Sequence, residues 1–124
     1  MAVITPAQLR EFSAFEAVKE RSDGLLTEDI LEAEIHINAR LEVPLDEHDP
    51  LPSQLRLAML KVAQFFALIN SDESRVKGIK SEKMSDYSYT LADGNELRLP
   101  DISVLLGDYA RQEEKKMIVR MRPL

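Results

Sequence analysis

Apolar residues recur at helical spacing along most of this chain, and they are densest between Ser53 and Asn70. A helical projection of that stretch shows apolar side chains almost all the way round, namely Leu55, Leu57, Met59, Leu60, Val62, Phe66, Ala67, Leu68 and Ile69. A helix that is apolar on every side is normally enclosed by other elements. Arg56 and Lys61 argue against a membrane span, because charges at membrane depth are expensive. The pattern therefore predicts a central buried helix over residues 53–70, with Ser53 as its N-cap.

Two short helices are predicted ahead of it. Thr5 followed by Pro6 is typical of a helix start, because Thr caps well and Pro suits the first helical turn. A second short helix is expected over residues 13–21, ended by the break at Ser22, Asp23 and Gly24. In the first of these helices Leu9 and Phe12 are predicted to face inward, and in the second Phe15 and Val18 lie one turn apart.

A longer helix is predicted from Thr27 to Glu42, with acidic residues in its first turn, where the helix dipole favours them. Its apolar residues form two stripes. The first stripe is Ile30, Ala33, Ile37 and Leu41, and the second is Leu31, Ile35 and Ala39. One stripe is enough for packing in a small bundle. The second stripe indicates either an unusually wide core face or a surface covered by a neighbouring subunit.

The remainder of the chain contains a loop, an arm and a short last helix. Three prolines place residues 43–52 in a loop. Alternation at Tyr87, Tyr89 and Leu91 predicts an extended, hairpin-like arm over about 77–99. Asp101 is expected to cap a helix that carries Ile102, Leu105, Leu106 and Tyr109, followed by a basic tail over 110–124. The sequence thus predicts one mainly α domain over residues 1–124, a small helical bundle around the helix at 53–70.

Charge is unevenly distributed over the 124 residues, whose net charge is −6. Eight acidic residues and one base, Arg40, lie between Thr27 and Pro50, whereas five bases and two acids lie from Arg111 to the end. An acidic chain is a poor candidate for gripping DNA, since affinity there comes mostly from Lys and Arg on phosphates. Acidic and basic regions can pair head to tail between copies, or simply aid solubility. The first residues show no secretory leader, and the absence of cysteine excludes disulfides.

No catalytic signature is found in the sequence. Glu32 and His36 are four residues apart on one predicted helix, but no second helix supplies the partner pair that a carboxylate-bridged metal site would need. His48 lies in an acidic loop and is expected to be solvated. Tyr87 and Tyr89 resemble base-stacking residues, yet few lysines accompany them, so packing or subunit contact is favoured. We therefore expect no enzymatic activity, no cofactor and no bound metal; a small metal-dependent enzyme using His36 stays as an alternative.

The segment GIKSEKMSDYSYTL (residues 78–91) resembles a segment of the head-to-tail connector, or adaptor, proteins of long-tailed phages. It is most similar to the branch found in phage-like elements of Bacillus-type genomes, which carries a K-S-E-x-x-x-D-Y-S-Y-T pattern. The matching residues are Lys80, Ser81, Glu82, Asp86, Tyr87, Ser88, Tyr89 and Thr90. Ser85 stands where that family often has Gly. Less specific similarity covers most of the chain, including the start at Ile4, Pro52 before the central helix, and the element around Leu105.

The resemblance implies a structural virion protein of a phage or prophage. Such proteins form a ring, usually of twelve copies, beneath the portal, where they extend the DNA channel and receive the stopper or tail-completion protein. The implied location is the head-tail interface of the virion, after assembly in the host bacterial cytoplasm. DNA would pass through without sequence-specific binding, and no membrane is involved. An acidic regulatory protein that binds another protein, possibly as a DNA mimic, is the alternative class.

Three groups of candidate interaction residues follow. Subunit or partner contacts are expected at Lys80, Ser81, Glu82, Lys83, Asp86, Tyr87, Tyr89, Leu31 and Ile35. By position in the resembling family, the tail that reaches the portal corresponds to Met117, Ile118, Val119, Arg120, Met121 and Arg122. The acidic residues expected to face the channel are Glu28, Glu32, Glu42, Asp46, Glu47 and Asp49.

Overall fold

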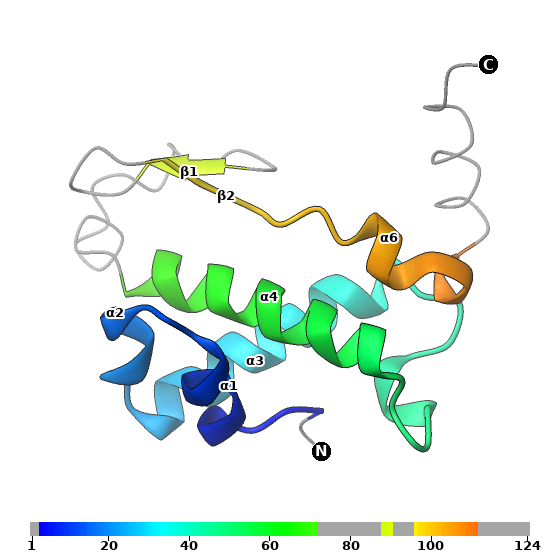
Figure 1. Ribbon diagram of the computed structural model, residues 1–124, viewed down its shortest axis with the longest axis horizontal. Helices are drawn as coiled ribbons and strands as arrows, with labels where there is room; N and C mark the ends of the chain where they lie inside the picture. Colours follow the sequence, from blue (N-terminus) through cyan, green and yellow to red (C-terminus); the bar gives the residue numbers. More distant parts are fainter. Residues whose placement is uncertain (1–2, 72–87, 91–95, 112–124) are drawn as a thin grey trace.

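The computed structural model describes residues 3–71, 88–90 and 96–111. It is mainly helical, which confirms the predicted fold class, and the long helices cross at the centre of the molecule (Figure 1). The elements in chain order are α1 (Pro6–Phe12), α2 (Glu16–Lys19), α3 (Asp23–Asn38), η1 (Leu45–Glu47), α4 (Ser53–Asn70), β1 (Ser88–Thr90), β2 (Glu96–Arg98), α6 (Ser103–Leu106) and η3 (Gly107–Tyr109).

Helix α4 is the predicted central helix, with the predicted bounds. Its buried side chains lie on several sides of the helix: Leu55, Ala58, Met59, Leu60, Val62, Ala63, Phe65, Ala67, Leu68 and Ile69. They pack against α3, α1, α2, α6 and β2, which explains why the sequence is apolar almost all round. The predicted cap is off by one residue, because Pro52 occupies the N-cap position and Ser53 is already helical.

Helices α1 and α2 bury less than the sequence predicts. Thr5 and Gln8 form a reciprocal capping box at the start of α1, and Leu9 and Val18 are fully buried. The predicted inward position of Phe12 is wrong, since its ring is 37% exposed, and the Phe15 ring is 46% exposed. Helix α1 ends at Phe12 and the chain turns at once, so both rings lie at the edge of the bundle.

Helix α3 begins at Asp23, four residues before the predicted start at Thr27. Ser22 is the N-cap, and its hydroxyl accepts a hydrogen bond from the Leu25 backbone N–H. Gly24 lies in the first turn, where it interrupts no buried contact because it is exposed. Thr27 instead donates its hydroxyl to the Asp23 carbonyl inside the helix. The prediction failed because the chain offers two good capping residues, and the earlier one is used.

The arm and the last helix are described in part. Strands β1 and β2 pair antiparallel, with Tyr89 opposite Leu97, as expected for a hairpin. Residues 77–87 and 91–95 of the predicted arm lie outside the described residues. The last helix is shorter than predicted, because Gly107 adopts a φ of 46° that ends α6 after Leu106. The N-cap of α6 is Ile102, one residue after the predicted Asp101, although the Asp101 carboxylate accepts a hydrogen bond from the Ser103 backbone N–H.

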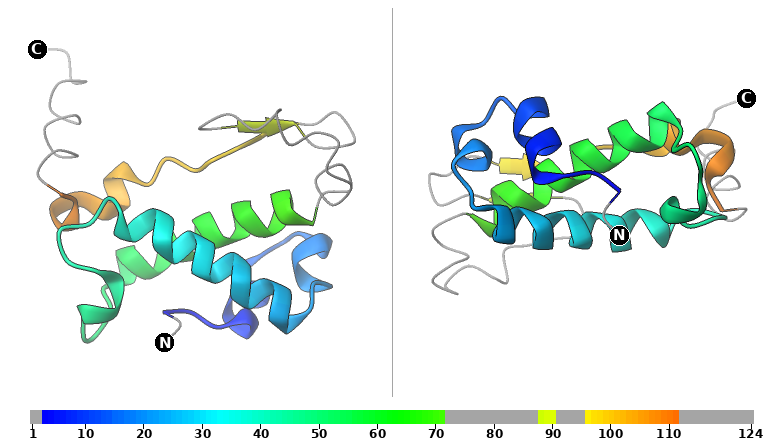
Figure 2. Two further views of the ribbon diagram at one scale, coloured as in Figure 1. Left: turned by 180° about the vertical axis from the view of Figure 1, so that it is seen from behind. Right: turned by 90° about the horizontal axis from the view of Figure 1, so that it is seen from below.

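The elements surround α4 on three sides (Figures 1 and 2). Helix α3 lies behind it in Figure 1, α1 and α2 lie below it and towards the viewer, and the segment from β2 to α6 runs above it. The right-hand view of Figure 2 places α3 along one edge of the molecule and α1 along the opposite edge. Among the described residues, none of the helices combines the length and apolarity needed to cross a membrane.

Candidate functional site: the outer face of α3

Helix α3 has one face in the core and another that no other described element covers. The inner face holds the predicted first stripe, and Ile30, Ala33 and Ile37 are each at most 1% exposed. The second stripe lies opposite: Leu31 is 55% exposed, Ile35 is 64% exposed and Ala39 is also exposed. The left-hand view of Figure 2 shows α3 running across the near side with nothing in front of it.

We call Glu28, Leu31, Ile35 and Ala39 the outer face of α3. Residues at spacings of three and four follow one line along a helix. Ile35 lies close to the line opposite the buried stripe, and within residues 3–71, 88–90 and 96–111 no element packs on it. Complete burial of a leucine or isoleucine side chain contributes about 1.5–3 kcal/mol. Single exposed apolar side chains are common, but two stacked on adjacent turns form the beginning of a contact surface.

Exposed acidic side chains lie on α3 and in the loop that follows it. All six of the acidic residues predicted to face a channel are exposed: Glu28, Glu32, Glu42, Asp46, Glu47 and Asp49. Glu28 and Glu32 lie on α3, whereas the other four follow it in the loop before α4. Glu34 lies nearer the core, and burial is the main reason that its pKa is raised. The second stripe is therefore apolar at its centre and negative at its margins.

One acidic residue of α3 has a structural role that the sequence analysis missed. Asp29 is 1% exposed, and its Oδ2 lies 2.6 Å from Arg21 Nε. The side-chain amide of Asn70 donates to Asp29 Oδ1 and to Glu32 Oε1, at 2.9 Å each. These bonds link the loop before α3, α3 itself and the end of α4. The sequence did contain a signal for the burial of Asp29. It lies three residues after Leu26 and four before Ala33, so it is on the same side of the helix as these two buried side chains.

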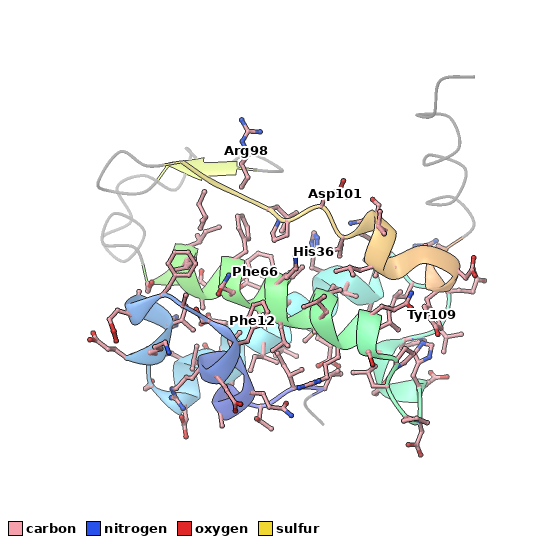
Figure 3. All side chains as sticks on the ribbon, in the orientation of Figure 1. Phe12, His36, Phe66, Arg98, Asp101 and Tyr109 are labelled. Carbon is pink, nitrogen blue, oxygen red and sulfur yellow. The ribbon has the colours of Figure 1, made fainter. Side chains whose placement is uncertain are left out.

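His36 lies half-buried on the flank of α3 rather than at a metal site. Its ring meets the Phe66 ring edge-on at 5.9 Å (Figure 3). Nε2 is buried and has no hydrogen-bond partner among the residues that the structure describes. Burial, and then the Arg40 charge, lower the pKa of this imidazole. Glu32, the carboxylate considered beside it, is bonded to Asn70. Within the described part of the chain, no three His, Asp or Glu side chains gather as a metal site.

His48 is not fully solvated, contrary to expectation. Its Nε2 lies 3.3 Å from the Val43 carbonyl oxygen, and its ring meets the Tyr109 ring edge-on at 5.4 Å.

Backbone and side-chain hydrogen bonds attach the last described residues, Ala110 and Arg111, to the end of α3. Leu41 and Ala110 form an antiparallel bridge, the Arg111 N–H donates to the Arg40 carbonyl at 2.8 Å, and Arg111 Nη1 donates to the Ala39 carbonyl at 3.0 Å.

The structure does not place the other predicted contact residues. Lys80, Ser81, Glu82, Lys83, Asp86 and Tyr87 lie outside the described residues, as do residues 117–122 of the predicted portal-contacting tail. Tyr89 is described only as a residue of β1, paired with Leu97. Of the predicted subunit contacts, Leu31 and Ile35 are those that the structure places, on the outer face of α3.

The chain was also compared with known proteins. It is 39% identical over 113 residues to the uncharacterized protein YkzL of Bacillus subtilis (strain 168), an alignment that covers 88% of this chain and 87% of that one. A family model described as a protein of unknown function, DUF3199, matches residues 3–122. Because that match spans almost the whole chain, the protein belongs to the DUF3199 family.

Proposed function

We propose that this protein is a structural adaptor of a tailed phage or prophage, which forms a ring under the portal and bridges it to the tail. In this role it has no catalytic activity and needs no cofactor. Its partners are further copies of itself, the portal protein, and a stopper or tail-completion protein. The identification of these partners rests on the resemblance at Lys80–Thr90.

The observation that carries the proposal is the exposed apolar line of α3. A protein that acts alone gains nothing from Leu31 and Ile35 on the side of a helix facing away from its core. A protein that works as one subunit among several has a neighbour to bury them. The same side chains would serve a regulatory protein that binds one partner, and the experiment below separates these two classes.

The charge distribution supports a protein that surrounds DNA without holding it. Glu28, Glu42, Asp46, Glu47 and Asp49 are exposed, and the net charge of the chain is −6. A channel lined by carboxylates repels phosphate, so DNA slides along it rather than binding. In this proposal the acidic loop after α3 faces the channel.

Native mass spectrometry of the protein, alone and mixed with the portal protein encoded in the same element, tests the proposal. We expect a full ring of adaptor subunits to add to the portal ring. A protein that ignores the portal at every salt concentration, and binds a different protein as a monomer or dimer, would instead be the acidic regulatory protein.

A double substitution tests the arm. Tyr87→Ala with Tyr89→Ala is expected to reduce the amount of adaptor on the portal while leaving the helical circular-dichroism signal unchanged. Ser71→Ala, at the C-cap of α4 and outside the arm, is the control. If the tyrosine variant loses its helical signal, the two rings belong to the core and the arm is not a contact surface.

A further inference from the structure

The last described residues are fixed at one end of the outer face of α3. Leu41 and Ala110 form an antiparallel bridge. The Arg111 backbone N–H donates to the Arg40 carbonyl at 2.8 Å, and the Arg111 guanidinium donates to the Ala39 carbonyl at 3.0 Å. We call this attachment the anchor. Since Ala39 is the last residue of the outer face, the chain beyond Arg111 starts where that face ends.

The antiparallel pairing at the anchor also sets the direction in which the chain leaves it. Residues 40–42 run from the end of α3 towards the loop before α4, and residues 109–111 run beside them in the opposite direction. The chain beyond Arg111 therefore starts towards the end of α3 and away from residues 43–52.

The segment that follows the anchor, residues 112–124, is long enough to reach the exposed apolar side chains of α3. Ile35 and Leu31 lie about 6 and 12 Å along the helix axis from the end of the outer face. Met117 is six residues beyond Arg111, a span of about 9 Å for a helical segment and about 20 Å for an extended one. In either conformation the segment reaches both side chains.

The part of this segment that can reach the apolar side chains is itself apolar and basic. Its two acids, Glu113 and Glu114, both precede Met117. The apolar residues come later in the segment: Met117, Ile118, Val119, Met121 and Leu124. The bases among them are Arg120 and Arg122, and α3 contains five acidic residues and no lysine or arginine. Charge therefore does not oppose a contact that the position of the anchor favours.

We propose that residues 112–124 fold back over the outer face of α3 in the same chain and cover Leu31 and Ile35. A segment attached beside its binding surface has an effective concentration in the mM range, so even a weak contact is occupied. A second copy has to reach the same face at its own, lower concentration. Denaturant releases a local contact of this kind before the helices unfold, so it adds little to the free energy of unfolding.

This inference goes beyond the proposed function, because a contact within one chain needs no partner. One consequence does rest on that function. In the proposed adaptor the same tail reaches the portal, so its departure from α3 would expose Leu31 and Ile35 only on a subunit that has docked. The contact is then autoinhibitory, since a free subunit keeps its apolar side chains covered.

Paramagnetic relaxation measured by NMR on the full chain tests the contact. The chain contains no cysteine, so Arg120→Cys gives a single thiol that carries a nitroxide spin label. We expect faster relaxation of the backbone amides of Leu31 and Ile35 than of Val43 and Asp46. The latter two follow the anchor on the side away from which the tail starts, so they report what attachment alone produces.

Two double substitutions in the labelled protein remove the contact from either side. Ile118→Ser with Met121→Ser changes the tail, and Leu31→Ser with Ile35→Ser changes α3. The excess relaxation at positions 31 and 35 should be lost in both. Leu25→Ser is the matched control, because Leu25 is 46% exposed in the first turn of α3, before the outer face begins, and should leave the excess unchanged. The amide spectrum itself shows whether each variant is folded.

Two results would overturn the inference. Equal relaxation on the two sides of the anchor would show that the tail is attached but not docked on α3. The second result comes from mixing spin-labelled protein with a separate, isotope-labelled protein that has no spin label. If the excess at Leu31 and Ile35 arises only between such molecules, the tail of a second copy covers them.

The portal experiment is read separately. An adaptor that loads on the portal but shows no excess relaxation on α3 keeps the proposed function and loses this contact. A protein that shows the excess and ignores the portal keeps the contact and loses the function.

Discussion

Helices α3 and α4 lie against each other, yet they are used differently. Helix α4 is apolar on nearly all sides and is covered on nearly all sides. Helix α3 is also apolar on two sides, but the described part of the chain covers only one of them: Ile37 is 0% exposed and Ile35 is 64% exposed. The apolar pattern of a helix therefore shows which side chains could be buried. Whether they are buried within one chain depends on which elements pack beside the helix.

The largest expected effect comes from removing the buried carboxylate on the inner face of α3 and comparing it with removal of a carboxylate from the outer face. Asp29→Ala leaves Arg21 without its carboxylate partner in a largely buried position, and loss of one member of a buried pair costs about 3–5 kcal/mol. We expect urea denaturation to show a decrease in the free energy of unfolding of that size. Glu28→Ala, one residue earlier but on the outer face, should change it by less than about 0.5 kcal/mol. If Asp29→Ala lowered the free energy of unfolding no more than Glu28→Ala does, Asp29 would not stabilise the fold.

The second test compares apolar truncations on the two helices. Leu60 of α4 is 6% exposed, so Leu60→Ala should reduce the free energy of unfolding by about 2–5 kcal/mol. Ile35→Ala removes a similar side chain from the outer face of α3 and should cost at most about 0.5 kcal/mol at low protein concentration. A large loss in the dilute Ile35 variant would mean that this side chain is part of the core of the bundle.

The smallest expected effect is the contribution of His36, on the flank of α3, to the pH dependence of the free energy of unfolding. Its pKa in the folded protein is lower than the ordinary value of 6.5 because burial disfavours the charged ring. The unfolded chain therefore binds a proton first, and stability falls as the pH drops below about 6.5. The His36 side chain is only partly buried, so water screens its charge, and we expect the loss to be about 1 kcal/mol or less.

The measurement is thermal unfolding of the wild-type protein and of His36→Gln between pH 7.5 and pH 5. The carboxylates contribute equally to both proteins, so the difference between the two curves isolates the imidazole. Parallel curves over that interval would show that His36 titrates alike in the folded and unfolded states.

The sequence predicts the helical class, the bounds of α4 and the inner face of α3, because burial on a regular helix leaves a periodic pattern. It misplaces Phe12, because periodicity does not show where a helix ends and the chain turns away. It identifies the line through Leu31 and Ile35 but cannot say whether a wide core or a neighbour covers it. It misses the bonds between Asp29, Arg21 and Asn70, because these residues come from three separate elements.

The bridge between Leu41 and Ala110 has a mechanical consequence. Arg111 is held to the end of α3 by its own N–H and by its guanidinium, so a pull on the C-terminal end reaches α3 directly. The short helix α6 lies inside the loop that this bridge closes and is shielded from the load. The C-terminal side of the chain can thus carry tension into α3, which packs against α4, rather than unravelling α6 first.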